Sequence, residues 1–322
     1  MANVAKIGGL VTKALKSSNA RQLVYSTGGN RGIFFDAFKE FNSRPHMAKK
    51  LSKDIFAASG KVKANADAIL KPICDDLGEF GSRLKKIPKI NGKIPKAMSE
   101  LTLDEFKEYL MLGKVTNLMG DGYGARIIIN NPKDVPKLVK RLINLHNEGK
   151  IKISLVENYR GNNINPYING NFLRQFEELS YKSVEGLERH VNVLNKVKKA
   201  GYTRANMDIF INGVKTEFQI GGKYTTRFGE VEHYLYDMRG FGNPDLSKLS
   251  SEQRQLFDLM KEKYILVAKN KKTDKIYNDY LSDIWNRLKN AEEKGLLFPE
   301  LPDPTEGIPK ILSIKNLFKL EH

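Results

Sequence analysis

Residues 207–220 constrain the fold more than any other stretch of the chain. Two runs rich in β-branched and aromatic residues flank the dipeptide Asn212-Gly213. That dipeptide favours positive φ at both central positions of a type I′ turn, so the segment predicts a tight β-hairpin. In its second strand alternate residues share a face. Lys215, Glu217 and Gln219 therefore form a polar face opposite a face that packs.

Apolar spacing elsewhere predicts further helices and strands. Residues 51–84 are expected to be helical, 126–130 to form a buried strand, 133–147 an amphipathic helix that Gly149 closes, and 152–156 another strand. Residues 85–98 hold five lysines, two prolines and one glycine, which predicts a basic loop. A capping box at 102–105 predicts a helix over about 103–112.

The last third of the chain is expected to be helical, with one helix starting after residue 250 and another over about 275–293, ended by Gly295. The whole pattern predicts an α/β or α+β fold. We divide it into a basic N-terminal extension (1–50), a core (51–245) and a helical C-terminal extension (246–322).

The charge of the chain is strongly positive and uneven. It has 54 Lys and Arg against 37 Asp and Glu, and the first 100 residues hold 19 of the bases and 8 of the acids. This excess favours a polyanionic partner such as a nucleotide or RNA, although a solvated basic surface is the alternative. A single cysteine, Cys74, excludes an internal disulfide and suits a reducing compartment. With no apolar run of about 20 residues, a cytoplasmic protein without a membrane partner is expected.

Several common catalytic motifs fail. Gly120-x-Gly122-x-x-Ala125 matches a dinucleotide-binding fingerprint in letters, but a predicted strand follows it where the fingerprint needs a helix. Phosphate-loop, His-Glu-x-x-His and Gly-x-Ser-x-Gly motifs are absent from the sequence, and the histidines lack metal-ligand spacing.

With those motifs excluded, three polar residues remain as candidates for a functional site. Asp121 stands at the entry to the strand over 126–130, Tyr202 precedes the hairpin, and Glu217 lies on its polar face. A pair of carboxylates suits a magnesium ion that bridges phosphates during phosphoryl or nucleotidyl transfer. Each residue also has an ordinary explanation: Asp121 as a turn residue, Glu217 on a solvated face, and Tyr202 in a core.

The order of these motifs resembles the synthetase domain of the RelA/SpoT family, whose members transfer pyrophosphate from ATP to a nucleotide 3′-hydroxyl. Asp121-x-x-Gly124-x-Arg126, Gly201-Tyr202, Glu217-Phe218-Gln219-Ile220 and Glu232-His233-Tyr234-Leu235-Tyr236 are similar to four family motifs. Pro88-Lys89 with Ile94, Lys96 and Met98 loosely resembles the family's basic ATP-binding stretch. Three further segments resemble the phage-borne and polymorphic-toxin branch: Glu157-Asn158-Tyr159-Arg160-Gly161, Pro166-Tyr167 and Tyr236-Asp237-Met238-Arg239.

The resemblance implies a mixed sheet flanked by helices, a nucleotidyltransferase-like core, and Mg²⁺ with ATP as co-substrate. It implies catalytic or metal-binding roles for Asp121, Glu217 and Gln219. It implies acceptor contacts from Tyr202, Arg204, Asn206 and His233. It implies ATP contacts from Lys89, Lys93, Lys96 and Arg126.

The sequence departs from the family where Arg204-Ala205-Asn206 replaces Ser-Ile-His and Gly221 replaces an arginine. Acceptor recognition is therefore expected to differ. The resemblance implies a purine nucleotide as acceptor, or a tRNA 3′ end as in toxin members, with an antitoxin or a virion component as further partners. The alternative is a catalytically decayed synthetase fold that serves as a basic structural or packaged phage protein, located in the virion.

Overall fold

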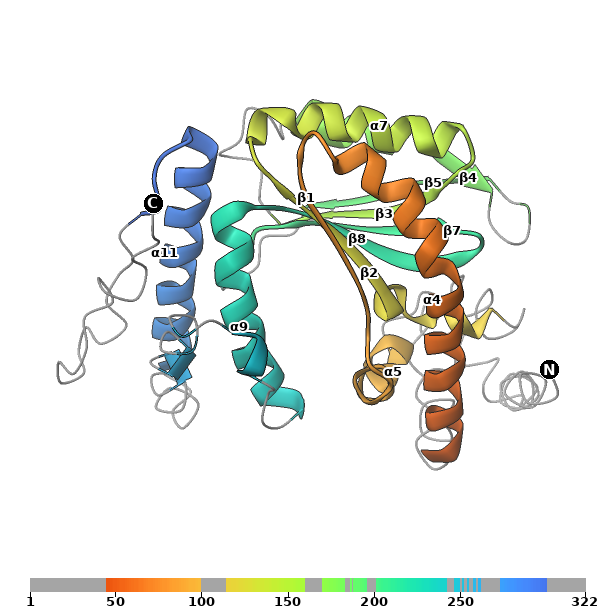
Figure 1. Cartoon of the computed structure of the whole chain (residues 1–322), viewed down its shortest axis with the longest axis horizontal. Helices are drawn as coiled ribbons and strands as arrows, with labels where there is room; N and C mark the ends of the chain where they lie inside the picture. The colour runs from red at the N-terminus through yellow and green to blue at the C-terminus, as the bar shows by residue number, and fades with distance from the viewer. Residues whose placement is uncertain are drawn as a thin grey trace, which may run out of the picture.

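The computed structural model describes residues 45–99, 114–159, 170–182, 186, 188–195, 201–241, 246–249, 251, 254, 257–258, 260–261 and 273–299. At its centre lies a six-stranded mixed sheet with strand order β1-β2-β8-β7-β3-β6, and helices pack around it (Figure 1). This arrangement confirms the predicted fold class.

The strands of this sheet are β1 (Gly78–Leu84), β2 (Tyr123–Ile129), β3 (Lys152–Asn158), β6 (Asn192–Asn195), β7 (Ala205–Ile211) and β8 (Val214–Gly222). A second, two-stranded sheet consists of β4 (Ser180–Lys182) and β5 (Glu188–His190). The longer helices are α4 (Pro45–Cys74), α5 (Ile87–Ser99), α7 (Val135–Asn147), α8 (Gly170–Glu177), α9 (Lys223–Phe241) and α11 (Thr273–Lys294). Short 3-10 helices are η2 (Val115–Leu118), η3 (Gly120–Gly122), η4 (Pro132–Asp134) and η5 (Leu246–Lys248).

The predicted hairpin forms the middle of the sheet. Strands β7 and β8 pair antiparallel from Ala205↔Ile220 to Ile211↔Val214. Asn212 and Gly213 both have positive φ, 51° and 75°, as a type I′ turn requires. Strand β2 joins the outer side of β8 in parallel, and β3 joins β7 antiparallel. The hairpin prediction is therefore confirmed.

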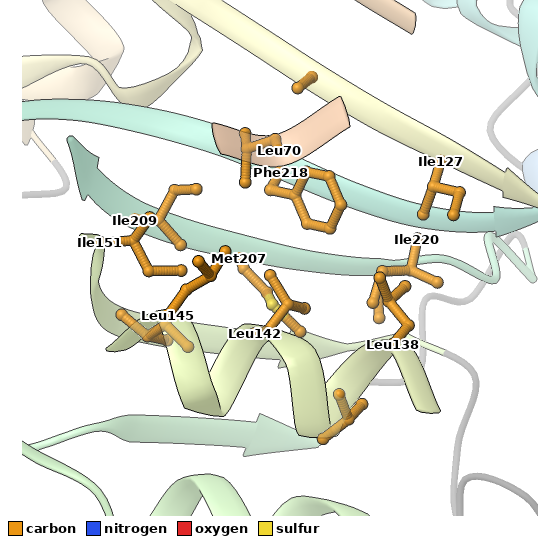
Figure 2. Close-up of a cluster of buried hydrophobic side chains, with 14 of the residues drawn as sticks. Leu70, Ile127, Leu138, Leu142, Leu145, Ile151, Met207, Ile209, Phe218 and Ile220 are labelled. Carbon is orange, nitrogen blue, oxygen red and sulfur yellow. The ribbon is translucent and has the colours of Figure 1, made fainter. Parts of the chain in front are cut away.

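One face of the sheet carries the main hydrophobic core. Helices α4 and α7 cover this face, and α7 contributes Leu138, Leu142 and Leu145 against Met207 and Phe218 of the hairpin (Figure 2). The α7 helix is amphipathic, so the spacing that predicted it also buries its apolar side. Burying side chains of this size removes enough apolar surface to stabilise the sheet by about 1.5–3 kcal/mol for each of them.

The opposite face of the hairpin is polar, as its alternation predicted. Glu217 lies between Gly124 of β2 and Asp208 of β7 in the strand register. Two residues further along β8, Gln219 lies between Arg126 and Asn206. The sheet therefore gathers charged and amide side chains from three neighbouring strands on one face.

Most predicted elements around the hairpin are confirmed with extended or shortened ends. The strands expected at 126–130 and 152–156 are β2 and β3, and the helix expected at 133–147 is α7. Gly149 has φ 71°, as a residue that closes a helix does. The helix expected at 275–293 is α11, with Gly295 at φ 64° just beyond its end.

The prediction of a helix over residues 51–84 was wrong in its last part. Helix α4 ends at Cys74, and β1 begins at Gly78 and pairs antiparallel with β2. A Cβ on Gly78 would lie 2.1 Å from the carbonyl oxygen of Ile128, so the glycine permits this close pairing. Helical spacing alone could not reveal a partner strand that lies about 45 residues further along the chain.

The prediction of a basic loop over residues 85–98 was also wrong, because most of this segment forms helix α5. Ile90 and Ile94 are fully buried at helical spacing, and α5 packs against α4. Pro88 lies in the first turn, where a helix loses no hydrogen bond to proline. Packing of this apolar stripe outweighs the glycine and the second proline.

The helix expected over 103–112 and most of the basic extension over 1–50 lie outside the described residues. Residues 251, 254, 257–258 and 260–261 are helical, in agreement with the helix expected after residue 250. Among the helices that the structure describes, none has the length and apolar character needed to cross a membrane.

Candidate active site

Asp121 lies in η3, immediately before β2, and its carboxylate bonds two lysines. Its Oδ2 atom accepts hydrogen bonds from Lys85 Nζ and, at 2.8 Å, from Lys93 Nζ. Lys85 follows β1 directly, and Lys93 belongs to α5. The correction of 85–98 from loop to helix thus explains how Lys93 reaches the strand entry.

The Gly-Asp-Gly sequence of η3 fits this location. A Cβ on Gly120 would lie 3.0 Å from Asp208 Oδ1, and a Cβ on Gly122 would lie 2.4 Å from Ser59 Oγ of α4. The two glycines let η3 lie close to both α4 and the hairpin, which sets Asp121 against the polar face.

The charges of this cluster shift one another's pKa values. Burial acts to raise the pKa of Asp121, but the two ammonium groups outweigh it and hold this pKa at about 2. Burial lowers the pKa of Lys85 to about 8, against the opposing pull of Asp121. Burial also acts on Lys93, yet the Asp121 carboxylate leaves its pKa raised. Asp121 is therefore ionised at neutral pH.

Glu217 has the opposite shift. Burial raises its pKa first, and the negative charges of Asp121 and Asp208 raise it further, while a hydrogen bond with the Gln219 side chain opposes them. Its neighbour in the register is Gly124, where a Cβ would lie only 3.8 Å from Glu217 Oε2. The structure thus brings together Asp121 and Glu217, which stand almost 100 residues apart in the sequence.

Asp208 is a third carboxylate of this cluster, and sequence reasoning missed it. It forms an ion pair at 2.9 Å with Lys215, and both side chains are mostly buried. Lys85 was likewise not singled out from its neighbours. The alternation of β7 could have pointed to Asp208, since it shares a face with Asn206, but the strand register is needed to place it beside Glu217.

Tyr202, the predicted acceptor platform, is partly exposed and lies among aromatic rings. It makes edge-to-face contacts with Tyr159 (5.4 Å between ring centroids) and Trp285 (5.8 Å). Burial raises its pKa, and the charge of Glu217 also raises it, whereas Arg204 acts in the other direction. Tyr202 is thus within electrostatic reach of the carboxylate cluster.

Arg204 connects the platform to the polar face instead of projecting outward. Its guanidinium lies 5.8 Å from the centre of the Tyr202 ring, and its Nη1 atom donates to Gln219 Oε1 at 3.1 Å. Its Nη2 atom donates to the carbonyl of Thr226. Within the described part of the chain, the buried guanidinium therefore donates its hydrogen bonds to neutral oxygens.

The remaining predicted residues lie at different distances from this cluster. Arg126, which lies beside Gln219 in the strand register, forms an ion pair at 2.6 Å with Glu230 of α9. Asn206 faces Gln219 across the hairpin, and its Oδ1 atom is buried with no partner among the described residues. His233 is on α9 and partly exposed.

The two other lysines predicted to hold ATP are on α5 with Lys93. Lys89 is exposed, one turn before Lys93 on the same side of the helix. Lys96 is one turn beyond Lys93, and its side chain lies outside the described residues. Helix α5 therefore supplies a row of basic positions, and Lys93 in this row contacts Asp121.

The described side chains in this region do not form a complete metal-binding site by themselves. Across the described ranges, no group of three or more His, Cys, Asp or Glu side chains is placed to hold a metal ion. Any divalent ion at Asp121 and Glu217 would need further ligands from a substrate or from water.

No model of a known protein family matches the chain, and no curated protein matches it. Among solved structures, the chain is similar to the crystal structure of the small alarmone synthetase 1 from Bacillus subtilis bound to AMPCPP, with 17% identity over 72% of this chain and 98% of that chain. The TM-score is 0.23.

Proposed function

We propose that the chain is an ATP-dependent pyrophosphokinase that resembles the RelA/SpoT synthetases. The observation that supports this most directly is the meeting of two sequence motifs on one polar face: ionised Asp121, bonded to Lys85 and Lys93, and Glu217, whose pKa the charge of Asp121 helps to raise. Shifted pKa values cluster at functional sites, and phosphoryl transfer depends on basic side chains and carboxylate-bound metal ions that neutralise phosphate charge.

In the proposed reaction the acceptor hydroxyl oxygen attacks the β-phosphorus of ATP. A new oxygen–phosphorus bond forms, the bond from that phosphorus to the α–β bridging oxygen breaks, and AMP leaves. Glu217 takes the hydroxyl proton, for which its raised pKa makes it a better base than an ordinary glutamate. Lys93 and Lys89 on α5 hold the triphosphate, with Lys96 as a third candidate.

A magnesium ion fits the residues present. Mg²⁺ is usually bound by one or two carboxylates together with substrate phosphates and water, and dedicated cages of protein ligands are uncommon. Asp121 is ionised, and the charges of Asp121 and Asp208 raise the pKa of Glu217, so a cation near these groups would relieve their repulsion. When bound, the ion would neutralise charge on the triphosphate.

The acceptor is proposed to stack on Tyr202, with Asn206 facing its base. The unpartnered Oδ1 atom of Asn206 is an acceptor that suits an N–H group on a base edge. A purine nucleotide fits this platform. A tRNA 3′ end is the second acceptor class, favoured by the 19 Lys and Arg in the first 100 residues.

The test is direct. The purified protein is incubated with ATP labelled on its β- or γ-phosphate, with Mg²⁺ or with a chelator, and with GDP, GTP, AMP, ADP or bulk tRNA in turn. We expect label on one acceptor class, dependent on Mg²⁺, with release of AMP. Transfer to none of these acceptors would overturn the proposal and favour a decayed synthetase fold with a structural role.

A further inference from the structure

The aromatic contacts of Tyr202 continue into the C-terminal helix α11. Trp285 of this helix is fully buried and presents its indole ring edge-to-face to Tyr202, with an interplanar angle of 74°. Tyr159, which follows β3, also contacts the Tyr202 ring edge-to-face, with an interplanar angle of 72°. Edge-to-face contacts are directional, so two of them restrict how the Tyr202 ring can turn.

The backbone next to Tyr202 also lies directly on α11. Gly201 has φ 84°, and a Cβ at this position would lie 2.8 Å from Ser282 Cα and 2.9 Å from Trp285 Cβ. A side chain at residue 201 is excluded both by the backbone conformation and by the helix. The main chain that carries Tyr202 is thus pressed against one turn of α11.

Helix α11 is itself held in place relative to the polar face. The Glu292 carboxylate is buried and accepts a hydrogen bond at 2.6 Å from the backbone N–H of Thr225, in the first turn of α9. It also accepts from Thr225 Oγ1. This carboxylate caps the start of α9 from another helix, where negative charge is favourable. Trp285 packs on Phe228 of α9, with ring centroids 4.9 Å apart.

We propose that Trp285 is a positioning residue, which sets the orientation of Tyr202 for stacking on the acceptor base. The proposal rests on the function proposed above and extends the acceptor half of the site to α11. Trp285 itself touches no reacting atom. Its indole N–H is buried without a hydrogen-bond partner among the described residues, and its contacts with Tyr202 and Phe228 are contacts between rings.

The experiment uses two substitutions at this position and one matched control. Trp285→Leu removes the aromatic edge, and Trp285→Phe keeps one. Phe257→Leu changes another fully buried ring of the same hydrophobic cluster, which contacts Tyr234 at 6.5 Å. The KM for the acceptor, the KM for ATP, kcat and Tm are measured for each variant.

We expect Trp285→Leu to raise the acceptor KM by about 3- to 10-fold, the size expected for one lost aromatic contact, with the ATP KM unchanged. Trp285→Phe should restore most of the loss. Phe257→Leu should lower Tm while both KM values stay as in the wild type. Equal changes in the two KM values, or the same pattern from Phe257→Leu, would reduce Trp285 to a packing residue.

A binding measurement separates this inference from the proposed reaction. Trp285 is the single tryptophan of the chain, so its fluorescence reports on the surroundings of Tyr202. GDP, GTP, AMP or ADP added without ATP should change the emission of the wild type, and Tyr202→Leu should abolish the change. If product forms but no acceptor alters the emission, the inference fails and the function stands. If no acceptor is modified, an emission change that depends on Tyr202 still supports the inference.

Discussion

Lys85 and Asp121 form a buried ion pair across 36 residues of sequence, at the point where β1 ends and β2 begins. Lys93 completes the pair from α5. Breaking such an arrangement from one side leaves a buried charge without its partner, which costs more than the pair itself contributes. The pair is therefore a sensitive point for both activity and pH dependence.

Replacing Asp121 by Asn should lower the rate of transfer by ~10²-fold or more, the range seen when one electrostatic contributor is removed from an active site. The change keeps the shape of the side chain, so circular dichroism should show an intact fold, but Tm should fall because Lys85 and Lys93 lose the charge that they pair with. Asp76→Asn is the matched control, because Asp76 is also bonded to two basic residues, Lys137 and Arg141, but on the surface. Turnover near the wild-type value in Asp121→Asn would remove Asp121 from the site.

The pH profile of kcat/KM should fall on its alkaline side near pH 8. Lys85 has a pKa of about 8, so above this pH its ammonium loses the proton and the positive charge beside Asp121 disappears. On the acid side activity should fall as Glu217, whose pKa is raised, takes up a proton. Lys85→Arg should move the alkaline fall upward, because arginine stays charged. An unchanged alkaline side in Lys85→Arg would assign this fall to another group.

Tyr202→Ala should weaken the acceptor and leave ATP nearly unaffected. Stacking of a base on an aromatic ring contributes ~1–3 kcal/mol, so the acceptor KM should rise by about 5- to 150-fold. Steady-state kinetics with each substrate varied in turn provides the measurement. Equal weakening of both substrates would show that Tyr202 only packs against its neighbours.

Arg204→Met should lower both stability and activity. Arg204 is buried, and the partners described for its guanidinium are the neutral oxygens of Gln219 and Thr226. Methionine leaves these buried acceptors without their donor, so Tm should fall. We expect kcat to fall about tenfold at a temperature where the variant is folded, because Gln219 loses the bond that orients it beside Glu217. A lower Tm with unchanged kcat would show that Arg204 has a purely structural role.

Removal of the basic N-terminus tests whether tRNA is the acceptor. A chain that begins at Pro45 loses seven Lys and Arg and two Asp and Glu. If these bases contact tRNA phosphates, each lost contact should make the salt dependence of log K shallower by about 0.7 for single strands or 0.9 for duplex. Filter binding over a salt series measures this slope. An unchanged slope together with unchanged activity would favour a small nucleotide as acceptor.

The elements that sequence alone predicted are those whose cause is local. The hairpin follows from Asn212-Gly213, and α7 from an apolar stripe with a closing glycine. The apolar residues of β1 were predicted to be helical from their local spacing. That spacing does not show the pairing of Gly78 with Ile129, because this pairing depends on a strand that is distant in sequence.

The same division holds for the site. Asp121 and Glu217 could be selected because each stands at a predicted strand in a motif of recognisable order. Lys85 looked like one lysine among five, and Asp208 like one polar residue of a hairpin. Their importance depends on burial and on neighbours from other strands, which no local pattern contains.

The central place of the hairpin in the sheet has a consequence for synthesis of the chain. The outer sides of β8 and β7 receive β2 and β3, both of which leave the ribosome earlier. Strand β3 lacks its partner β7 until residue 211 has emerged, and β2 lacks its partner β8 until residue 222 has emerged. Until then the apolar side of α7 has no completed sheet to cover. Unpaired strand edges and exposed apolar surface of this kind make a nascent chain prone to aggregation. Strands β2 and β3 and helix α7 therefore remain incompletely packed until the hairpin has been synthesised. Chaperone binding to the nascent chain should be strongest just before residues 205–222 emerge.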